Sequence, residues 1–379
     1  MSGRGGSATH RCRGCGSSRV SPVLDLGRQA ASDFFPPVDA PGPDPRWPLE
    51  LWFCLDCTLV QLGPVQPPLP EIPLAVESAT SLANAARSVR DILAERPELA
   101  GGTVAEFASH HGGSWLPDLT AAGVRPAPDG APAELVVDVH GLVHEPNLAD
   151  AFAERVSRLA PGGTLVLEFH HLLPLLRENQ YDTVRHGHWS YLSLGSLSRL
   201  AGVHGLVVAS ARAVPLFGGC LRVALRYAEQ ARVDPSVVAV LDAERDAGLA
   251  DPTRVATLGG SARDAALALH DRLAALAAQG RRVLGYGAPS KAAVLLDLSG
   301  IGPELLPFVV DAAPGKHGRR IPGAGVPIRP VRALRAARPD VVLILVWDLA
   351  EEVVDQLESG GGWGAEYLVP SGAPAVSCS

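Results

Sequence analysis

The sequence has no apolar run long enough to cross a lipid bilayer. Its longest apolar stretches, such as residues 341–347, are far shorter than the roughly 20 residues that a transmembrane helix needs. The opening segment, MSGRGGSATHRCRGCG, contains no apolar core of a secretory signal peptide. We therefore expect a cytoplasmic protein that neither spans a membrane nor is secreted.

A dense basic patch is also missing. The 379 residues include 33 Lys and Arg against 40 Asp and Glu, a formal net charge of -7, which argues against a nucleic-acid-binding protein. Small anionic ligands remain compatible with this charge, because they need only a local pocket. The length exceeds what one hydrophobic core usually supports, so we expect two large domains and a small module.

Cysteine is scarce, yet four of the six cysteines form two CxxC pairs. These four are Cys12, Cys15, Cys54 and Cys57. Four thiolates complete a closed tetrahedral zinc site, which stabilises a fold and leaves no open position for chemistry. Two disulfides are the alternative, which a reducing compartment disfavours. The remaining two cysteines, at positions 220 and 378, lack this spacing and are expected to be bystanders.

Apolar runs alternate with helical patterns along the middle of the chain, after a proline-rich connector at residues 62–73. The apolar runs are residues 103–107, 134–139 and 163–169, and the helical patterns are residues 81–95, 148–159 and 193–200. Such alternation predicts a parallel, doubly wound sheet. Two further runs, residues 206–213 and 220–227, predict an antiparallel hairpin that completes this sheet.

A second alternation follows a long helical stretch at residues 236–278. It consists of strand patterns at residues 282–286, 308–311 and 341–347, with a helix from residue 290. This pattern predicts a second, Rossmann-like domain. The fold class is therefore α/β, with a zinc-binding module at residues 1–63, a first α/β domain at residues 64–230 and a C-terminal Rossmann-like domain at residues 231–379.

The glycine-rich segment GYGAPSK lies where the first strand of the C-terminal domain is expected to turn into a helix. Backbone N–H groups and the helix dipole can bind a phosphate at such a turn. The segment therefore indicates ligand-binding roles for Tyr286, Gly287, Ser290 and Lys291. The alternative is a tight glycine turn with a solvated lysine.

Several longer segments follow one another along nearly the whole chain. They are CRGCG with LWFCLDCTLVQL, EFHHLLPLLRENQYDTVRHGHWSYLSL, FGGCLRV, GYGAPSKAAVLL, VVDAAPGKHGRRIPGAGVPI and PDVVLILVWDLAEEV. In this order they resemble the bacterial nucleotide-sugar C-methyltransferases, which methylate C3 of 4-keto-6-deoxy sugars for antibiotic biosynthesis. The resemblance implies that the first α/β domain has a class I methyltransferase fold. It also implies a nucleotide-sugar substrate, expected to be dTDP-linked, between the two large domains.

The resemblance further implies a mechanism in which a base near the HxH motif, His186 to His188, removes a proton beside the sugar ketone. The resulting enediolate carbon then attacks the methyl group of S-adenosylmethionine. His188 matches the base, and Arg185, where the family has tyrosine, is a candidate for stabilising the enediolate oxygen. The implied substrate-binding residues are Asn179, Lys316 and Arg319, together with the glycine-rich segment. Alternatively, the two histidines are polar residues of a surface loop.

The donor-binding part of the chain departs from the family pattern. Only about twenty residues separate Gly112 from the strand pattern that begins at residue 134, although each parallel crossover takes a dozen or more. We therefore expect the second strand, its ribose-binding acid and the adenine-binding segment to be absent. The donor loop reads EFASHHG instead of E-x-A-S-N-D-G, which leaves Glu106, Ser109 and Gly112 as its remnant. The HxH motif reads RHGH instead of YHEH, and aromatic residues expected at 75–78 are missing, so the sequence argues against S-adenosylmethionine as a cofactor.

Histidine occurs at the carboxyl ends of three neighbouring predicted strands, where a doubly wound fold builds its active site. Imidazoles together with a carboxylate can bind a second divalent metal, which would polarise a ketone or activate water. The candidate ligands are His110, His111, His140, His170, His171 and Glu168. Alternatively, each histidine fills space left by the donor or is solvated.

Three functions compete on this sequence. The leading hypothesis is an enzyme that retains the nucleotide-sugar pocket and performs proton-transfer or metal-assisted chemistry without S-adenosylmethionine. The second is a working sugar C-methyltransferase with a rearranged, shortened donor pocket. The third is a non-catalytic, sugar-nucleotide-binding partner protein, against which the retained His186, His188 and Lys291 argue.

Overall fold

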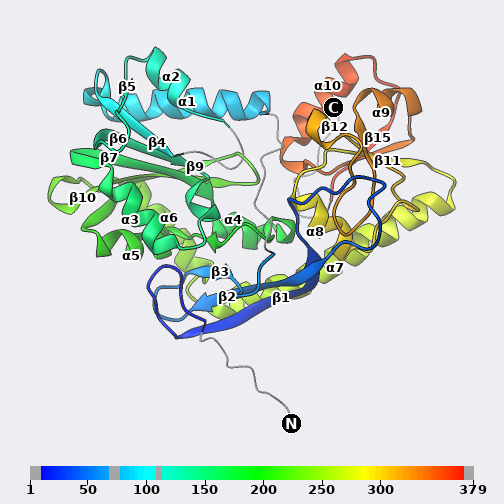
Figure 1. The fold of residues 1–379 in the computed structure, drawn as a ribbon, viewed down its shortest axis with the longest axis horizontal. Coiled ribbons are helices and arrows are strands. Elements are labelled where there is room, and N and C mark those ends of the chain that lie inside the picture. Colours follow the sequence, from blue (N-terminus) through cyan, green and yellow to red (C-terminus); the bar gives the residue numbers. More distant parts are fainter. Residues whose placement is uncertain (1–9, 68–76, 108–112, 371–379) are drawn as a thin grey trace, which may run out of the picture.

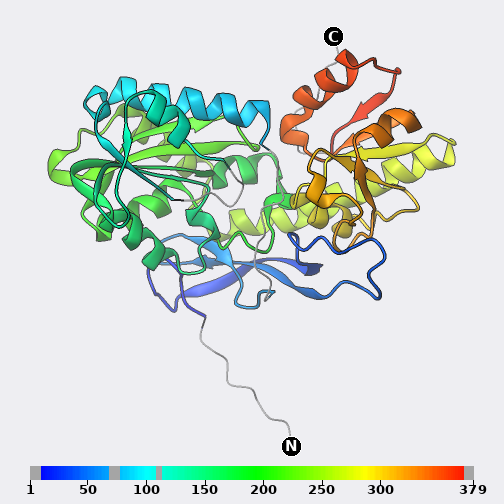
Figure 2. The same cartoon turned by 45° about the horizontal axis from the view of Figure 1, so that its top comes forward.

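The computed structural model describes residues 10–67, 77–107 and 113–370, and these residues form three sheets. A small antiparallel sheet near the N-terminus lies beneath two larger α/β domains, which stand next to each other (Figure 1). The same arrangement is visible after a turn of 45° (Figure 2). Because its first strand also packs against helices of the C-terminal domain, the small sheet is a common base for both large domains.

The N-terminal sheet has the strand order β1 (Val20–Ala30), β2 (Arg46–Cys54), β3 (Val60–Leu62) and β8 (Ser190–Tyr191). Apolar side chains alternate along β2, so that Leu49, Leu51 and Phe53 are buried on one face of the sheet. The last strand, β8, comes from the HxH segment and pairs with β3. This pairing fixes the HxH segment to the zinc module.

The middle domain has a six-stranded sheet in the order β5 (Arg125–Pro126), β4 (Thr103–Phe107), β6 (Ala133–Val139), β7 (Leu159–His170), β10 (Cys220–Tyr227) and β9 (Leu206–Val214). The first four strands are parallel, and the predicted hairpin of β9 and β10 is antiparallel. Helices α1 (Ala79–Glu95) and α2 (Leu116–Ala121) pack on one face. Helices α3 (Leu148–Ser157), α5 (Leu194–Val203) and α6 (Pro235–Asp246) pack on the other. The predicted α/β fold is confirmed.

Beyond β4, the middle sheet contains less strand than a full methyltransferase sheet but more than the sequence predicts. Strand β5 occupies the position where we expect no second strand, so that expectation is wrong in this detail. Its two residues pair only with Thr103 and Val104, at the start of β4. The chain then turns, with Ala131 N–H donating to the Pro128 carbonyl, and enters β6. Among the described residues, the sheet has no strand outside β5.

The C-terminal domain has a parallel sheet in the order β13 (Ile328–Pro330), β12 (Val309–Asp311), β11 (Val283–Tyr286), β14 (Val341–Ile344) and β15 (Glu366–Leu368). Helices α7 (Pro252–Ala278) and α8 (Lys291–Leu298) cover one face. Helices α9 (Arg332–Ala337) and α10 (Ala350–Ser359) cover the other. The strand order reverses between β11 and β14, which is where a doubly wound sheet opens a ligand-binding crevice.

The long helical pattern at residues 236–278 is two helices rather than one. Helix α6 ends before Gly248, which has a φ of +74°, and α7 begins at Pro252 after the side chain of Asp251 caps its N-terminus. Helix α6 packs against β9 of the middle sheet, whereas α7 packs against β1. The strand pattern at residues 341–347 likewise ends early, at Ile344, because Trp347–Leu349 form a turn of 3₁₀-helix.

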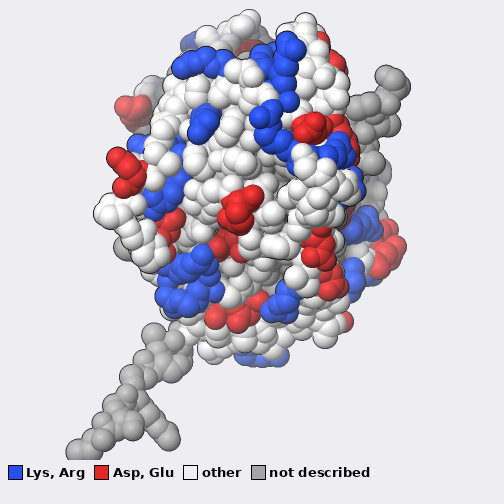
Figure 3. All heavy atoms as spheres, turned by 90° about the vertical axis from the view of Figure 1, so that its right-hand side faces the viewer, with Lys and Arg blue, Asp and Glu red and all other residues white. Residues whose placement is uncertain are grey.

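Charged groups of both signs are interspersed on the face formed by the C-terminal domain (Figure 3). No helix in the described part of the chain is both long and apolar enough to cross a membrane.

We predict that Phe152→Ala destabilises the middle domain by about 3–5 kcal/mol, because it leaves a cavity in a closely packed core. Phe152 lies on α3, is fully buried and belongs to the cluster between that helix and the sheet. Urea unfolding of the full chain measures the change. The control is Val203→Ala on α5, whose side chain is 81% exposed and whose loss should change the unfolding free energy by less than about 0.5 kcal/mol. Equal effects of the two substitutions would contradict this packing.

Candidate functional site

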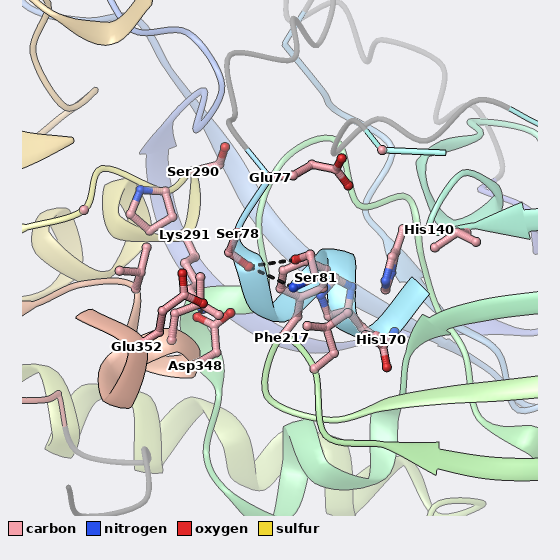
Figure 4. A pocket seen from close by; sticks show the side chains of 18 of the residues that line it. Glu77, Ser78, Ser81, His140, His170, Phe217, Ser290, Lys291, Asp348 and Glu352 are labelled. Carbon is pink, nitrogen blue, oxygen red and sulfur yellow. Dashed lines mark hydrogen bonds and ion pairs between the residues drawn. The ribbon is translucent and has the colours of Figure 1, made fainter. Parts of the chain in front are cut away.

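A cavity of about 520 Å³ lies between the middle and C-terminal domains. The carboxyl ends of both parallel sheets face it. The middle domain contributes residues at the ends of β4, β6 and β7, and the C-terminal domain contributes residues that follow β11 and β14. Figure 4 shows His140 and His170 on one side, with Ser290, Lys291 and Asp348 on the other. Both sheets thus present their ligand-binding edges to one shared space.

Histidines from three separate segments meet on the middle-domain side of this cavity. His140 follows β6, His170 ends β7, and His188 belongs to the HxH motif. The ring centroids of His140 and His170 are 4.9 Å apart, and those of His170 and His188 are 5.4 Å apart. His144 lies behind them, with its ring centroid 4.7 Å from that of His188. The structure therefore brings together three of the histidines that the sequence singles out.

Cys220 is next to this group, although the sequence analysis treats it as a bystander. In the antiparallel ladder of β10 and β7, Cys220 stands opposite His170. Its Sγ lies 3.9 Å from Nε2 of His140, and the thiol is completely buried. The sequence analysis does not place Cys220 here, because spacing along the chain does not show which residues face each other across two strands. The predicted hairpin at the end of the sheet was the available signal.

Burial controls the charges at the inner end of the cavity. It lowers the pKa of His140 to about 4, so the imidazole is neutral at pH 7. Burial also raises the pKa of Glu168 to about 7, against the opposing effects of Arg222 and of a 3.0 Å hydrogen bond from the Asn84 amide. Glu168 Oε1 lies 3.9 Å from His140 Nε2. The site thus places the neutral imidazole of His140 beside a carboxyl group, Glu168, whose pKa lies near neutral pH.

His188 is positioned to act through one defined ring nitrogen. Gly187, with a φ of +92°, supplies the left-handed backbone conformation that turns the chain before it. Nδ1 of His188 lies 3.1 Å from the Thr183 carbonyl, and because a carbonyl can only accept, Nδ1 carries the proton and donates it. In the neutral ring, Nε2 is then the nitrogen with the lone pair. His188 lines the cavity, so the arrangement suits a general base.

Arg185 also lines the cavity, where it is held by Asp33 of the N-terminal module. The guanidinium of Arg185 donates to one carboxylate oxygen of Asp33, and the Ser290 hydroxyl donates to the other. Asp33 therefore joins the HxH motif to the glycine-rich segment. Sequence reasoning missed this residue, because it lies in the loop after β1 outside any motif.

The C-terminal side of the cavity contains two lysines whose charges are already offset. Lys291 pairs with Asp348, and its ammonium lies 3.7 Å from the ring centroid of Trp347. Lys316 donates to the Ala288 carbonyl at 2.8 Å and lies 3.8 Å from Asp311. An anionic ligand at this wall must therefore share these lysines with their carboxylates. Neither carboxylate is among the residues that the sequence analysis selects.

The backbone of the glycine-rich segment lies close to the residues that follow β14. Gly287 has a φ of +90°, and a Cβ added there would lie 2.8 Å from a methyl group of Val346. Only glycine fits this position without strain. Tyr286, the last residue of β11, lines the cavity and donates its hydroxyl to Gln356 at 3.4 Å.

Four predicted site residues lie elsewhere. Nε2 of His186 donates to the Pro48 carbonyl of β2 at 3.2 Å. The side-chain amide of Asn179 donates to the Ser261 carbonyl at 3.1 Å, and the Arg319 guanidinium donates to the Phe35 carbonyl at 2.6 Å. His171 follows His170 directly, but its side chain points to the other side of the chain, where Nε2 lies 2.6 Å from a carboxylate oxygen of Glu244. The structure does not bring these four side chains, His186, Asn179, Arg319 and His171, to the cavity.

The remnant donor loop is only partly described. Ser109, His110, His111 and Gly112 lie outside the described residues. Glu106 lines the cavity, and its carboxylate accepts hydrogen bonds from the Ser114 hydroxyl and, at 2.6 Å, from the Trp115 N–H. Glu106 therefore holds the start of α2, which follows the loop.

The four CxxC cysteines form a compact group at the end of the N-terminal sheet where β1 begins and β2 ends. All four sulfur atoms lie within 4.8 Å of one another, with Cys12 to Cys57 at 3.4 Å and Cys15 to Cys54 at 3.6 Å. Zn–S bonds of about 2.3 Å in a tetrahedron place sulfurs about 3.8 Å apart, so these residues fit a zinc ion. Four protein ligands leave no open position, which makes the site structural.

We predict that His186 makes the protein less stable as the pH falls. Burial lowers its pKa below the ordinary value of 6.5, against the opposing effects of hydrogen bonds to the Pro48 and Ala30 backbone. The unfolded chain then binds the proton more readily, so stability is lost as the pH falls through 6.5. We expect the free energy of unfolding, measured in urea, to fall less between pH 7.5 and pH 5.5 for His186→Gln than for the wild type. A His204→Gln control should behave like the wild type, whereas an unchanged acid loss in His186→Gln would contradict the prediction.

Two sequence families match parts of this chain. Residues 215–371 match the C-methyltransferase C-terminal domain family, and residues 12–69 match the Putative zinc binding domain family. The C-methyltransferase NovU of Streptomyces niveus is 29% identical over 407 residues, which cover 96% of this chain and 96% of NovU. The similarity to NovU therefore extends over all three parts of the structure.

Solved methyltransferase structures resemble a smaller part of the chain. Magnesium protoporphyrin IX methyltransferase from Synechocystis PCC 6803, solved with bound SAH, is 13% identical with a TM-score of 0.30, over 40% of this chain and 88% of that chain. An S-adenosylmethionine-dependent methyltransferase from Mesorhizobium loti is 14% identical with a TM-score of 0.27, over 39% of this chain and 100% of that chain.

Proposed function

We propose, on the premise that this chain belongs to the sugar C-methyltransferase family, that it is a cytoplasmic enzyme which transfers a proton beside the ketone of a nucleotide-linked sugar without using S-adenosylmethionine. The two matching families and the similarity to NovU support the premise. One observation carries the proposal: His188, the proposed base, lines the cavity, while the sheet edge next to β4 is reduced to the two residues of β5.

The described residues offer little for the ribose of the donor. Strand β5 ends at Pro126, and the first acidic residue after it, Asp129, is exposed and does not line the cavity. Glu106, which does line the cavity, already accepts hydrogen bonds from Ser114 and Trp115. The β5 edge thus supplies no carboxylate to the cavity, and this supports the loss of the donor site.

The retained groups suit removal of a proton from a carbon next to a ketone. Nε2 of His188 accepts the proton, the C–H bond breaks, and its electron pair moves to the ketone oxygen to give an enediolate. Return of the proton to the other face gives an epimer, and its return to the neighbouring carbon gives an isomer. Alternatively, the enediolate electron pair re-forms the ketone and expels an adjacent hydroxyl, which takes the proton from His188 and leaves as water to give a dehydrated sugar. Lys291 and Ser290 on the opposite wall face the same cavity and suit the diphosphate of the substrate.

A second function is methylation of C3 with S-adenosylmethionine. Similarity to NovU along 96% of the chain favours it. Both functions share the first step, because methylation also begins with proton removal by His188. They differ in whether the enediolate carbon receives a proton or a methyl group.

Mass spectrometry in D₂O distinguishes the two functions. The full-length enzyme is incubated with dTDP-4-keto-6-deoxyglucose, with and without S-adenosylmethionine. The proposal predicts a sugar that gains deuterium, or loses water, equally in both samples and gains no methyl group. A product heavier by a methylene unit, formed only with S-adenosylmethionine, would establish the second function. An unchanged sugar in both samples would oppose both and favour a non-catalytic sugar-nucleotide-binding protein.

A further inference from the structure

We propose that His140, His170 and Cys220 bind a divalent zinc ion at the inner end of the cavity, separate from the four-cysteine site. One ligand atom from each of these residues lies within 4.8 Å of the other two. The Sγ of Cys220 and Nε2 of His140 are 3.9 Å apart, close to the roughly 3.6 Å edge of a tetrahedron with Zn–S and Zn–N bonds of about 2.3 and 2.0 Å. The three side chains therefore already lie at the distances that ligands of one zinc ion require.

The fold brings the three ligands together through two features of the middle sheet. His170 and Cys220 face each other in the ladder between β7 and β10. His140 has a φ of +61°, and its N–H donates to the Glu168 carbonyl at 2.7 Å, which ties the end of β6 to β7. A non-glycine residue in this conformation costs energy, and such strain is concentrated at functional sites. The backbone thus aims His140 at the neighbouring strand.

The ligand chemistry favours zinc over magnesium or calcium. Thiolate and imidazole are the ligands that zinc prefers, whereas the harder ions require oxygen. The Cys220 thiol donates to the Leu216 carbonyl at 3.1 Å, and a metal would replace that proton. A carboxyl oxygen of Glu168 lies 3.9 Å from Nε2 of His140, beside the proposed ligands.

Three protein ligands leave one coordination position open, and this is the arrangement of catalytic zinc sites. His140 and His170 both line the cavity and Cys220 does not, so a zinc ion held by the three would lie next to the cavity, within reach of a substrate. A ketone oxygen at this position would be polarised by the metal while His188, next to His170, removes the proton. This catalytic part rests on the proposed function, whereas metal binding itself does not.

The proposed ligand set differs from the one expected from the sequence. Cys220 joins it, and His171 leaves it because its ring contacts Glu244. His110 and His111 lie outside the described residues and have no part in the proposal.

The test counts metal ions in the full-length protein. After saturation with Zn²⁺ and removal of loosely bound ions, elemental analysis should find two zinc ions per wild-type chain. His140→Asn, His170→Asn and Cys220→Ser should each bind one, whereas the control His204→Asn should bind two. Circular dichroism establishes that each variant is folded, and retention of the four-cysteine zinc serves as an internal check. One zinc ion in the saturated wild type, or two in folded Cys220→Ser and His140→Asn, would overturn the site.

A second readout does not depend on variants that might fold poorly. Wild-type protein with zinc in the four-cysteine site is titrated with Co²⁺, whose visible absorption reports tetrahedral thiolate ligation. We expect one equivalent of Co²⁺ to produce these bands and Cys220→Ser to lose the thiolate contribution. Absence of the bands from the wild type would also overturn the site. If the protein binds the second metal but does not exchange deuterium into the sugar, the proposed function is refuted and the metal site stands. If it exchanges deuterium with only one zinc ion per chain, the metal site is refuted and the proposed function stands.

Discussion

Replacement of His188 by asparagine is expected to reduce deuterium exchange into the keto-sugar by about 10²–10⁴-fold, the usual contribution of a general base. Asparagine can still donate a hydrogen bond to the Thr183 carbonyl, which His188 Nδ1 contacts at 3.1 Å, but it has no basic nitrogen. The loss should therefore fall on kcat, because the side chain acts on the reacting carbon and holds no other part of the substrate.

The exchange rate is measured by mass spectrometry at saturating sugar nucleotide. His204→Asn is the matched control, because it makes the same chemical change at a residue that does not line the cavity. The control should exchange at the wild-type rate. Full exchange by His188→Asn would remove His188 as the base and, with it, the proposed mechanism.

Loss of the structural zinc should have the largest effect on stability. Cys54 is fully buried at the end of β2, and its Sγ lies 3.6 Å from that of Cys15. Structural zinc contributes about 10–16 kcal/mol to the folding of zinc-finger peptides, which is as large as the whole stability of a typical domain. We expect Cys54→Ser to unfold the segment from Cys12 to Leu62. The cores packed under α1 and α2 and under α9 and α10 contain no residue of this segment and should remain folded.

Hydrogen–deuterium exchange of backbone amides locates this unfolding. In Cys54→Ser, the amides of β1, β2 and β3 should exchange rapidly, and elemental analysis should find one zinc ion fewer per chain. Cys378→Ser makes the same chemical change away from the CxxC pairs and should leave both observations unchanged. Wild-type protection of β2 in a Cys54→Ser variant that has lost this zinc ion would contradict a structural role for the metal.

Loss of the N-terminal module should also disturb the cavity. Strand β8 pairs with β3, and the loop after β1 supplies Asp33 to both Arg185 and Ser290. We therefore expect faster amide exchange around the HxH motif in Cys54→Ser as well. The zinc module thus supports the position of the proposed base.

The larger features of the fold could be predicted because their signals are local. Buried parallel strands form continuous apolar runs, so β4 was placed at its correct residues and β6 and β7 were found within a few residues. The break between α6 and α7 was missed because Gly248 and Pro252 were outweighed by a continuous helical pattern. The remnant strand β5 was missed because two residues with proline carry no recognisable strand pattern.

The candidate site was only partly predictable, because its members meet through tertiary structure. His140 and His170 were selected from their places at strand ends, where parallel strands share one edge. Cys220 and Asp33 were not selected, because the strand register and the loop after β1 determine their neighbours. His171 points away from the cavity toward Glu244, because a shift of one residue along a strand reverses the direction of the side chain.

The central claim is that this scaffold has kept the sugar site of the family and lost the donor site. Calorimetric titration of the zinc-loaded, full-length protein with S-adenosylmethionine tests it most directly, with dTDP-4-keto-6-deoxyglucose as the parallel ligand. We predict heat of binding with the sugar nucleotide and none with S-adenosylmethionine. Micromolar binding of S-adenosylmethionine would contradict the claim and make C3 methylation the leading function.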